Sequence, residues 1–141
     1  MQRKGTAVWN GGLRDGKGTI SSASGVLNNT QYSFSTRFEN GIGTNPEELI
    51  GAAHAGCFSM AFSAALEKAG FKADRVATEA AVSLEKVGDG FSITAVHLTV
   101  SGKVPGIDNA KFQEIAAGAK AGCPVSKVLN AKITMDAKLE S

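Results

Sequence analysis

The chain has 141 residues, of which 43% are hydrophobic and 20% are charged, and its formal net charge is +2. This composition is typical of a globular protein, so we expect a single domain over residues 1–141. A charge this small argues against partners such as nucleic acid or an anionic membrane. The first residues lack the apolar segment of a signal peptide, and the two cysteines then favour a cytoplasmic location.

The first third of the chain predicts a three-stranded antiparallel meander. Residues 6–9 and 19–22 are short strand candidates on either side of a glycine-rich turn. Residues 32–38 alternate aromatic and polar side chains, which is the period of a half-buried strand. Phe38 interrupts the alternation, so we expect a bulge or the end of the strand near Arg37.

A long helix is predicted over residues 45–70, with Asn45 as its N-cap and Gly70 at its end. Between its first and last turns almost every residue is apolar or small, so the helix must be buried on all sides. Gly51 and Gly56 indicate close backbone packing rather than a membrane span. At roughly 36 Å the helix is too long for one small chain to surround, so we expect a second subunit to cover part of it.

The remainder predicts a hairpin, two helices and a closing strand. A Gly-Asp-Gly turn at 88–90 joins the strand candidates, and Pro105 breaks the second of them. We therefore expect an α+β fold with mostly antiparallel sheets. The predicted elements are strands at 77–87 and 91–104, helices at 108–121 and 124–129, and a strand at 132–139.

The two cysteines occupy different helical positions. Cys57 lies in the middle of the long helix, whereas Cys123 lies between Gly122 and Pro124, at the cap of the short helix that follows. A helix N-terminus stabilises a thiolate, whereas Cys57 would need a nearby cation. From these residues alone, a catalytic pair and two buried apolar cysteines remain equally open readings.

Other candidate groups have simple structural explanations. His54 precedes Cys57 by three residues on the same helical face, so a Cys–His hydrolase dyad is conceivable, but a buried, hydrogen-bonded histidine is the commoner case. His97 is expected on a strand surface, and the histidines and cysteines lack the spacing of a zinc site. The glycine-rich segments 11–18 and 41–46 do not complete a nucleotide-binding motif.

Arg37 extends the predicted third strand beside aromatic residues, where its guanidinium would be partly desolvated. Glu47 and Glu48 suit the positive first turn of the long helix. Either glutamate could instead hold an arginine against a thiolate through a bidentate ion pair.

Two motifs together resemble the OsmC/Ohr family of thiol peroxidases, and its OsmC branch in particular. They are Asn-Pro-Glu-Glu-Leu-Ile-Gly-Ala-Ala-His-Ala-Gly-Cys-Phe-Ser-Met-Ala at 45–61 and Ala-Gly-Cys-Pro-Val-Ser at 121–126, and the resemblance extends over essentially the whole chain. It implies an intertwined homodimer in which sheets from both chains wrap two long helices. That architecture would bury the oversized apolar helix.

The resemblance also implies roles for four residues: Cys57 as the peroxidatic cysteine, Cys123 as the resolving cysteine, and Glu47 and Arg37 as active-site residues. The hypothesis is a peroxidase that reduces organic hydroperoxides, and hydrogen peroxide less well, through a Cys57 sulfenic acid and a Cys57–Cys123 disulfide. An external dithiol, of lipoyl type in the family, would restore both thiols. No metal, haem or flavin cofactor is implied.

The spacing of Glu47 and Cys57 has a geometric consequence. Ten residues of helix span about 15 Å, so Glu47 cannot serve the cysteine of its own helix, and we expect composite sites at the dimer interface. Apolar side chains such as Phe38, Phe58 and Met60 would favour alkyl hydroperoxides. The alternatives are a Cys-dependent hydrolase or transferase and a non-catalytic dimeric stress protein.

Overall fold

The computed structural model describes residues 1–141, and the contacts within the chain divide it into two compact units, Met1–Leu49 and Ile50–Ser141. The expected single domain over residues 1–141 stays a prediction.

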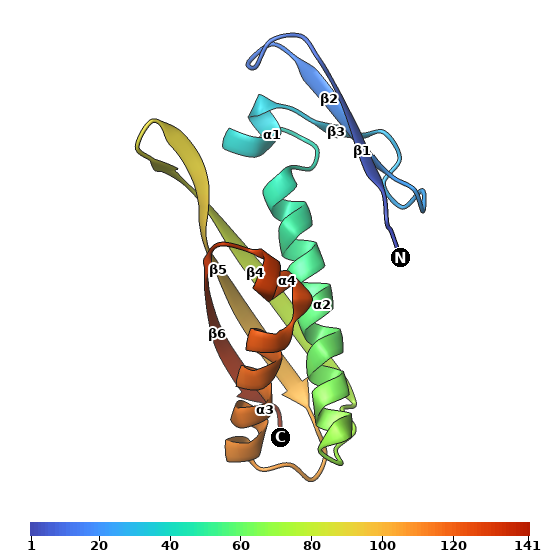
Figure 1. Cartoon of the computed structure of the whole chain (residues 1–141), viewed down its shortest axis with the longest axis vertical. Helices are drawn as coiled ribbons and strands as arrows, with labels where there is room; N and C mark the ends of the chain where they lie inside the picture. The colour runs from blue at the N-terminus through green and yellow to red at the C-terminus, as the bar shows by residue number, and fades with distance from the viewer. The chain divides into compact units, whose positions relative to one another are not determined.

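The first unit contains the predicted antiparallel meander, with strands in the order β1-β2-β3 (Figure 1). Gly18 on β2 lies opposite both Trp9 on β1 and Tyr32 on β3. A side chain at Gly18 would overlap the rings of Trp9 and Tyr32, which pack over it with their centroids 5.4 Å apart. The strands are β1 (Gly5–Asn10), β2 (Lys17–Ser22) and β3 (Thr30–Tyr32).

The prediction of a strand over residues 32–38 is wrong beyond its first residue. After β3 the chain turns into the short helix α1 (Phe34–Phe38). The cause is a local capping box: the Ser33 hydroxyl accepts from the Thr36 N–H, and the Thr36 hydroxyl oxygen accepts from the Ser33 N–H at 2.8 Å. These side-chain bonds to the backbone outweigh the alternating pattern and place Arg37 on a helical turn instead of a strand edge.

The long helix α2 (Pro46–Lys68) has the predicted limits. Asn45 caps it, because its Oδ1 accepts from the Glu48 N–H at 2.7 Å. The helix stops at Gly70, whose φ of 92° is left-handed, and the next N–H donates back to the carbonyl of Leu66 at 2.9 Å. This is the Schellman ending that a glycine at this position favours.

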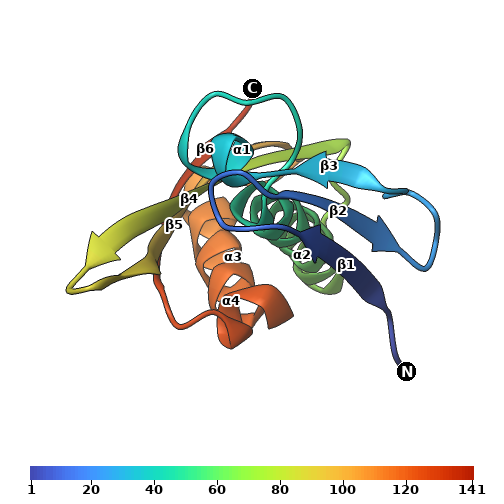
Figure 2. The ribbon, with the colours of Figure 1, turned by 90° about the horizontal axis from the view of Figure 1, so that it is seen from above.

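The second unit is a three-stranded sheet, ordered β4-β5-β6, with helices α2 and α3 on one face (Figures 1 and 2). The hairpin turns at Gly88, whose φ is 63°, as predicted. β6 pairs parallel to β5, and every other strand pair in the molecule is antiparallel. The prediction of an α+β fold with mostly antiparallel sheets is confirmed. The elements are β4 (Arg75–Val87), β5 (Gly90–Lys103), α3 (Asn109–Gly122), α4 (Pro124–Val128) and β6 (Lys132–Leu139).

The core of this unit is built on one stripe of α2. Phe58, Phe62 and Leu66 recur every four residues and are completely buried. The Phe62 ring lies 5.6 Å from that of Phe58 and 5.2 Å from that of Phe112 on α3. The remaining fully or almost fully buried apolar residues are Val96, Leu98, Val100, Val104, Ala116, Ala119 and Cys123.

The other side of α2 is uncovered in a single chain. Gly51 packs closely, because a Cβ there would come within 3.0 Å of the Ala80 carbonyl oxygen, but a Cβ at Gly56 would meet nothing. Met60, one turn further along, is 78% exposed. The length and composition of α2 would also suit a membrane span, but core helices of soluble proteins share both properties. Burial of this face by a second subunit stays a prediction.

Candidate active site

The two cysteines, 66 residues apart in sequence, meet in the second unit. The Sγ atoms of Cys57 and Cys123 are 2.9 Å apart, and both residues are free thiols. Cys123 ends α3 and caps the start of α4, as the sequence predicted. Cys123 is completely buried, whereas Cys57 is half-buried. Two thiols at this distance can close a disulfide, whose bond length is about 2.05 Å, with a small side-chain movement.

The surroundings of this pair favour a negative charge on Cys123. Burial raises the pKa of the Cys123 thiol, but donors on Cys57, Ser126 and Val125 outweigh this and bring its pKa below the ordinary value. For Cys57, burial raises the pKa, and the contact with Cys123 raises it further. When both thiols are protonated, Cys123 donates to Cys57. After the first proton is lost, the remaining proton on Cys57 points back at the Cys123 thiolate.

His54 is completely buried and bonds to a serine next to this pair. Its Nε2 lies 2.7 Å from the Ser126 hydroxyl oxygen, on the first turn of α4. Burial lowers the pKa of His54, so that the imidazole is neutral at neutral pH. The predicted buried, hydrogen-bonded histidine is confirmed. His54 makes no hydrogen bond to Cys57, which disfavours a Cys–His dyad.

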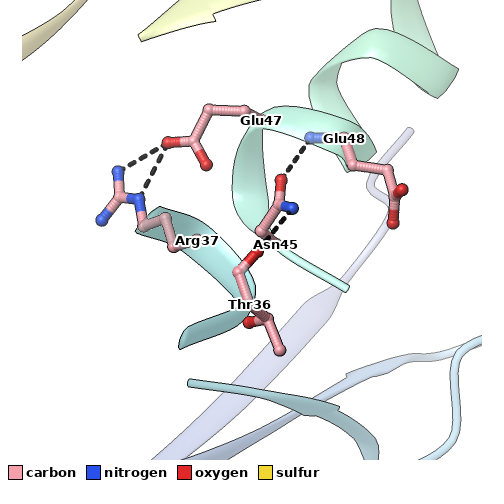
Figure 3. A network of polar contacts seen from close by, with 5 residues as sticks. All are labelled: Thr36, Arg37, Asn45, Glu47 and Glu48. Carbon is pink, nitrogen blue, oxygen red and sulfur yellow. Dashed lines mark hydrogen bonds and ion pairs between the residues drawn. The ribbon is translucent and has the colours of Figure 1, made fainter. Parts of the chain in front are cut away.

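Arg37 and Glu47 form an ion pair in the first unit (Figure 3). The Nε and Nη2 of Arg37 lie 2.9 and 2.7 Å from the same carboxylate oxygen, Oε1 of Glu47. The glutamate side chain is only 10% exposed, while the arginine side chain is 38% exposed. A buried carboxylate therefore holds a guanidinium whose outer side faces solvent, as in charge-assisted pairs that orient an arginine.

Asn45 ties together the two helices that carry this ion pair (Figure 3). Its Nδ2 donates to the Thr36 carbonyl at 3.0 Å, and its Oδ1 accepts from the Glu48 N–H. Thr36 immediately precedes Arg37, and Glu48 immediately follows Glu47. One amide side chain thus fixes the backbone beside each member of the ion pair.

An aromatic hollow of about 280 Å³ opens beside Arg37 in the same unit. The Arg37 guanidinium also lies 5.4 Å from the centre of the Phe38 ring. Phe38 lines the hollow, whereas Phe58 belongs to the buried core and cannot meet a substrate, contrary to our expectation for it. The lining residues are Trp9, Leu13, Tyr32, Ser33, Phe34, Arg37 and Phe38.

Each predicted site residue therefore has a partner: Cys57 contacts Cys123, and Arg37 contacts Glu47. The two pairs belong to different units of the chain. The contact of Ser126 was not predicted from the sequence. Its position three residues after the capping Cys123 is a signal that could have placed it beside that cysteine. The chain has no group of three His, Cys, Asp or Glu side chains that could hold a metal ion.

Known proteins are similar to this chain in both sequence and fold. The OsmC-like protein family matches residues 39–138. The chain belongs to the OsmC family. It is 56% identical over 141 residues to the peroxiredoxin OsmC of Escherichia coli strain K12, covering 100% of this chain and 99% of that one. It is also 35% identical over 124 residues to the organic hydroperoxide resistance protein OhrB of Bacillus subtilis, covering 87% and 88% of the two chains.

Solved structures of the OsmC and Ohr type have the same fold. The crystal structure of OhrB of Bacillus subtilis superposes with a TM-score of 0.71 at 27% identity, over 96% of this chain and 98% of that chain. The OsmC/Ohr resemblance inferred from the two cysteine motifs is therefore confirmed, together with the OsmC-like α+β fold.

Proposed function

We propose that this OsmC-family chain reduces organic hydroperoxides to alcohols with its two cysteines. The chain is a cysteine-based peroxidase, an oxidoreductase that takes peroxide as its oxidant. The observation that carries the proposal is the 2.9 Å contact between Cys57 and Cys123, in a chain 56% identical to a peroxiredoxin. Relatives named for organic hydroperoxide resistance support the class of substrate.

In this mechanism Cys57 is the cysteine that reacts with peroxide, because Cys123 is completely buried. The Cys57 thiolate attacks the distal oxygen of the hydroperoxide, the O–O bond breaks, and the leaving alkoxide takes a proton to become the alcohol. Cys57 is left as a sulfenic acid. The Cys123 sulfur then attacks the Cys57 sulfur and displaces the hydroxyl group as water, which forms the disulfide.

Arg37, oriented by Glu47, supplies a positive charge to the Cys57 thiolate, since the causes that shift the pKa of Cys57 include no cation. A guanidinium stabilises the thiolate and polarises the O–O bond. Since ten residues of helix span about 15 Å, we assign the Arg37–Glu47 pair of one subunit to the cysteines of the other. A mixed dimer of Cys57→Ser and Glu47→Ala chains then keeps one working site, whereas action within one chain leaves none.

The exposed face of α2 supports a homodimer. It carries small or flexible apolar side chains along one stripe, including Ala53, Gly56, Met60 and Ala64. An apolar helix face of this length in water is typical of a subunit interface. Small residues along it allow close helix–helix approach, and Gly56 has open space in front of it.

The hollow beside Arg37 supports an organic substrate over hydrogen peroxide. Its aromatic lining would gain from burying an alkyl or aryl group, which hydrogen peroxide does not have. Phe38 contributes to this preference, whereas Met60 lies on the exposed stripe of α2.

An external dithiol completes the cycle in this proposal. Its first thiol attacks the disulfide and its second thiol resolves the mixed disulfide, so the reductant leaves oxidised and both cysteines leave reduced. A lipoyl-type dithiol suits the family, and a reducing cytoplasm suits a pair that must start as free thiols.

The test is a single turnover of reduced protein with one equivalent of cumene hydroperoxide, followed by intact-mass analysis and peptide mapping. We expect rapid loss of two hydrogen atoms, mapped to a Cys57–Cys123 bridge and absent from both single Cys→Ser variants. The Cys123→Ser variant should stop at an oxidised Cys57. Slow oxidation scattered over other residues would refute the peroxidase and favour a hydrolase or a non-catalytic dimer.

A further inference from the structure

Two side-chain contacts join α2 to the corner between α3 and α4. Cys57 meets Cys123 with 2.9 Å between the sulfurs, and His54 Nε2 meets the Ser126 hydroxyl oxygen at 2.7 Å. On each segment the two residues are three positions apart, so they project from one side of a helical turn. The proposed mechanism uses the first contact and assigns no role to the second.

The tautomer of His54 follows from its surroundings. The side chain is completely buried, and its Nδ1 has no hydrogen-bond partner. A proton on Nδ1 would be a buried N–H without an acceptor, which is rarer in folded proteins than an acceptor left unpaired. We therefore assign the proton to Nε2, which donates to the Ser126 oxygen. The hydroxyl proton of Ser126 is then free for another acceptor.

The acceptor that fits is the sulfur of Cys123. Ser126 lies on the first turn after this cysteine, and its hydroxyl and N–H both lower the pKa of the Cys123 thiol, against the effect of burial. The titratable groups facing the sulfur are Cys57 and, through Ser126, His54, both from α2; the rest of the core cluster around Cys123 is apolar.

We propose that His54 and Ser126 are a positioning pair for the resolving step: His54 fixes the Ser126 hydroxyl so that its proton points at the Cys123 sulfur. The pair keeps Cys123 beside Cys57 and ready to react as a thiolate. This inference deepens the proposed function and rests on it.

The pair acts in both halves of the cycle without losing a proton itself. In closure, an electron pair of the Cys123 thiolate attacks the Cys57 sulfur, the S–O bond breaks, and the departing hydroxide takes a proton to form water. In reopening, a thiolate of the external dithiol attacks the Cys57 sulfur, the S–S bond breaks, and Cys123 leaves as a thiolate. A stabilised thiolate leaves faster, so the same hydrogen bond assists both steps.

The experiment separates closure from peroxide reduction. Reduced protein is mixed with one equivalent of cumene hydroperoxide and quenched at intervals, and mass analysis follows the Cys57 sulfenic acid, the disulfide and the over-oxidised sulfinic acid. The variants are Ser126→Ala, with Ser126→Thr as its conservative control, and His54→Phe, with His54→Gln as its control. Circular dichroism checks that each variant is folded, and the series is repeated across pH.

We expect Ser126→Ala to form sulfenic acid no more slowly than the wild type but to close the disulfide about tenfold more slowly at neutral pH, which is the effect of one hydrogen bond to a charged group. Closure should recover at higher pH, where Cys123 ionises unaided, and excess peroxide should yield sulfinic acid. His54→Phe should act in the same direction, and Ser126→Thr and His54→Gln should restore closure. Closure at the wild-type rate and with the wild-type pH profile in Ser126→Ala and His54→Phe would overturn the inference.

A second measurement keeps the inference testable even if peroxide reduction fails. In a Cys57→Ala background, the thiolate absorbance of Cys123 is titrated with and without the Ser126→Ala change. A shift of the titration to higher pH supports the positioning pair, and an unchanged titration overturns it. Failure of the proposed function would appear separately, as wild-type Cys57 that does not react with hydroperoxide.

Discussion

Replacing Asn45 tests how the Arg37–Glu47 ion pair is held. The Asn45 side chain makes two separable hydrogen bonds, one accepted from the Glu48 N–H and one donated to the Thr36 carbonyl. Asn45→Ala removes both. The lost helix cap costs about 1 kcal/mol, and the lost bond to the carbonyl costs about 1 kcal/mol more, so we expect the free energy of unfolding to fall by about 2 kcal/mol.

Asn45→Asp is the matched variant, because a carboxylate still caps the helix but cannot donate to the Thr36 carbonyl. We expect Asn45→Asp to lose only about 1 kcal/mol of stability, measured from urea unfolding with an unchanged m-value. The rate of Cys57 oxidation should separate the two roles of Asn45. Both variants free the backbone beside Arg37, so both should slow oxidation to a similar degree. Oxidation at the wild-type rate in Asn45→Asp would refute the idea that the bond from Asn45 to the Thr36 carbonyl positions Arg37. Equal stability of the two variants would refute the idea that the side chain of Asn45 caps α2.

Three further predictions follow from the charges and burial of the site. Arg37→Lys should slow Cys57 oxidation at least about tenfold, because lysine cannot make the paired contact with a carboxylate. Arg14→Lys is the control, since Arg14 also lies over an aromatic ring, 4.6 Å from its centre. An equal loss of rate in Arg14→Lys would contradict the role of Arg37 in Cys57 oxidation. Cys123→Ala should lower the pKa of Cys57, because it removes a contact that raises this pKa. Titration of the Cys57 thiolate should therefore move to lower pH. A shift to higher pH would contradict the shared ionisation of the two cysteines. Burial lowers the pKa of His54, so at acidic pH unfolded chains bind a proton that folded chains do not. The free energy of unfolding should therefore fall as the pH drops below about 6.5, by at most about 1.4 kcal/mol per pH unit. Urea unfolding of His54→Gln should lack this part of the slope, and an unchanged slope would contradict it.

Features set by neighbouring residues could be predicted from the sequence. The limits of α2 follow from the cap at Asn45 and the glycine at 70, because both act through bonds within one helical turn. Cys123 was placed correctly between two helices for the same reason. The two cysteine motifs were also sufficient to identify the family. The strand predicted at 32–38 does not form, because the capping box of Ser33 outweighs the alternating pattern of side chains.

Only the tertiary structure decided which distant side chains meet. The sequence offered both Glu47 and Glu48 as partners for Arg37, and the turn of α1 selected Glu47. It also left the partner of His54 open, and the packing of α4 against α2 brought Ser126 to it across 72 residues. Contacts at such separations depend on how whole elements pack, and no local pattern of residues encodes that packing. The sequence therefore determined the helix ends and the chemical groups, and the fold determined how those groups are paired.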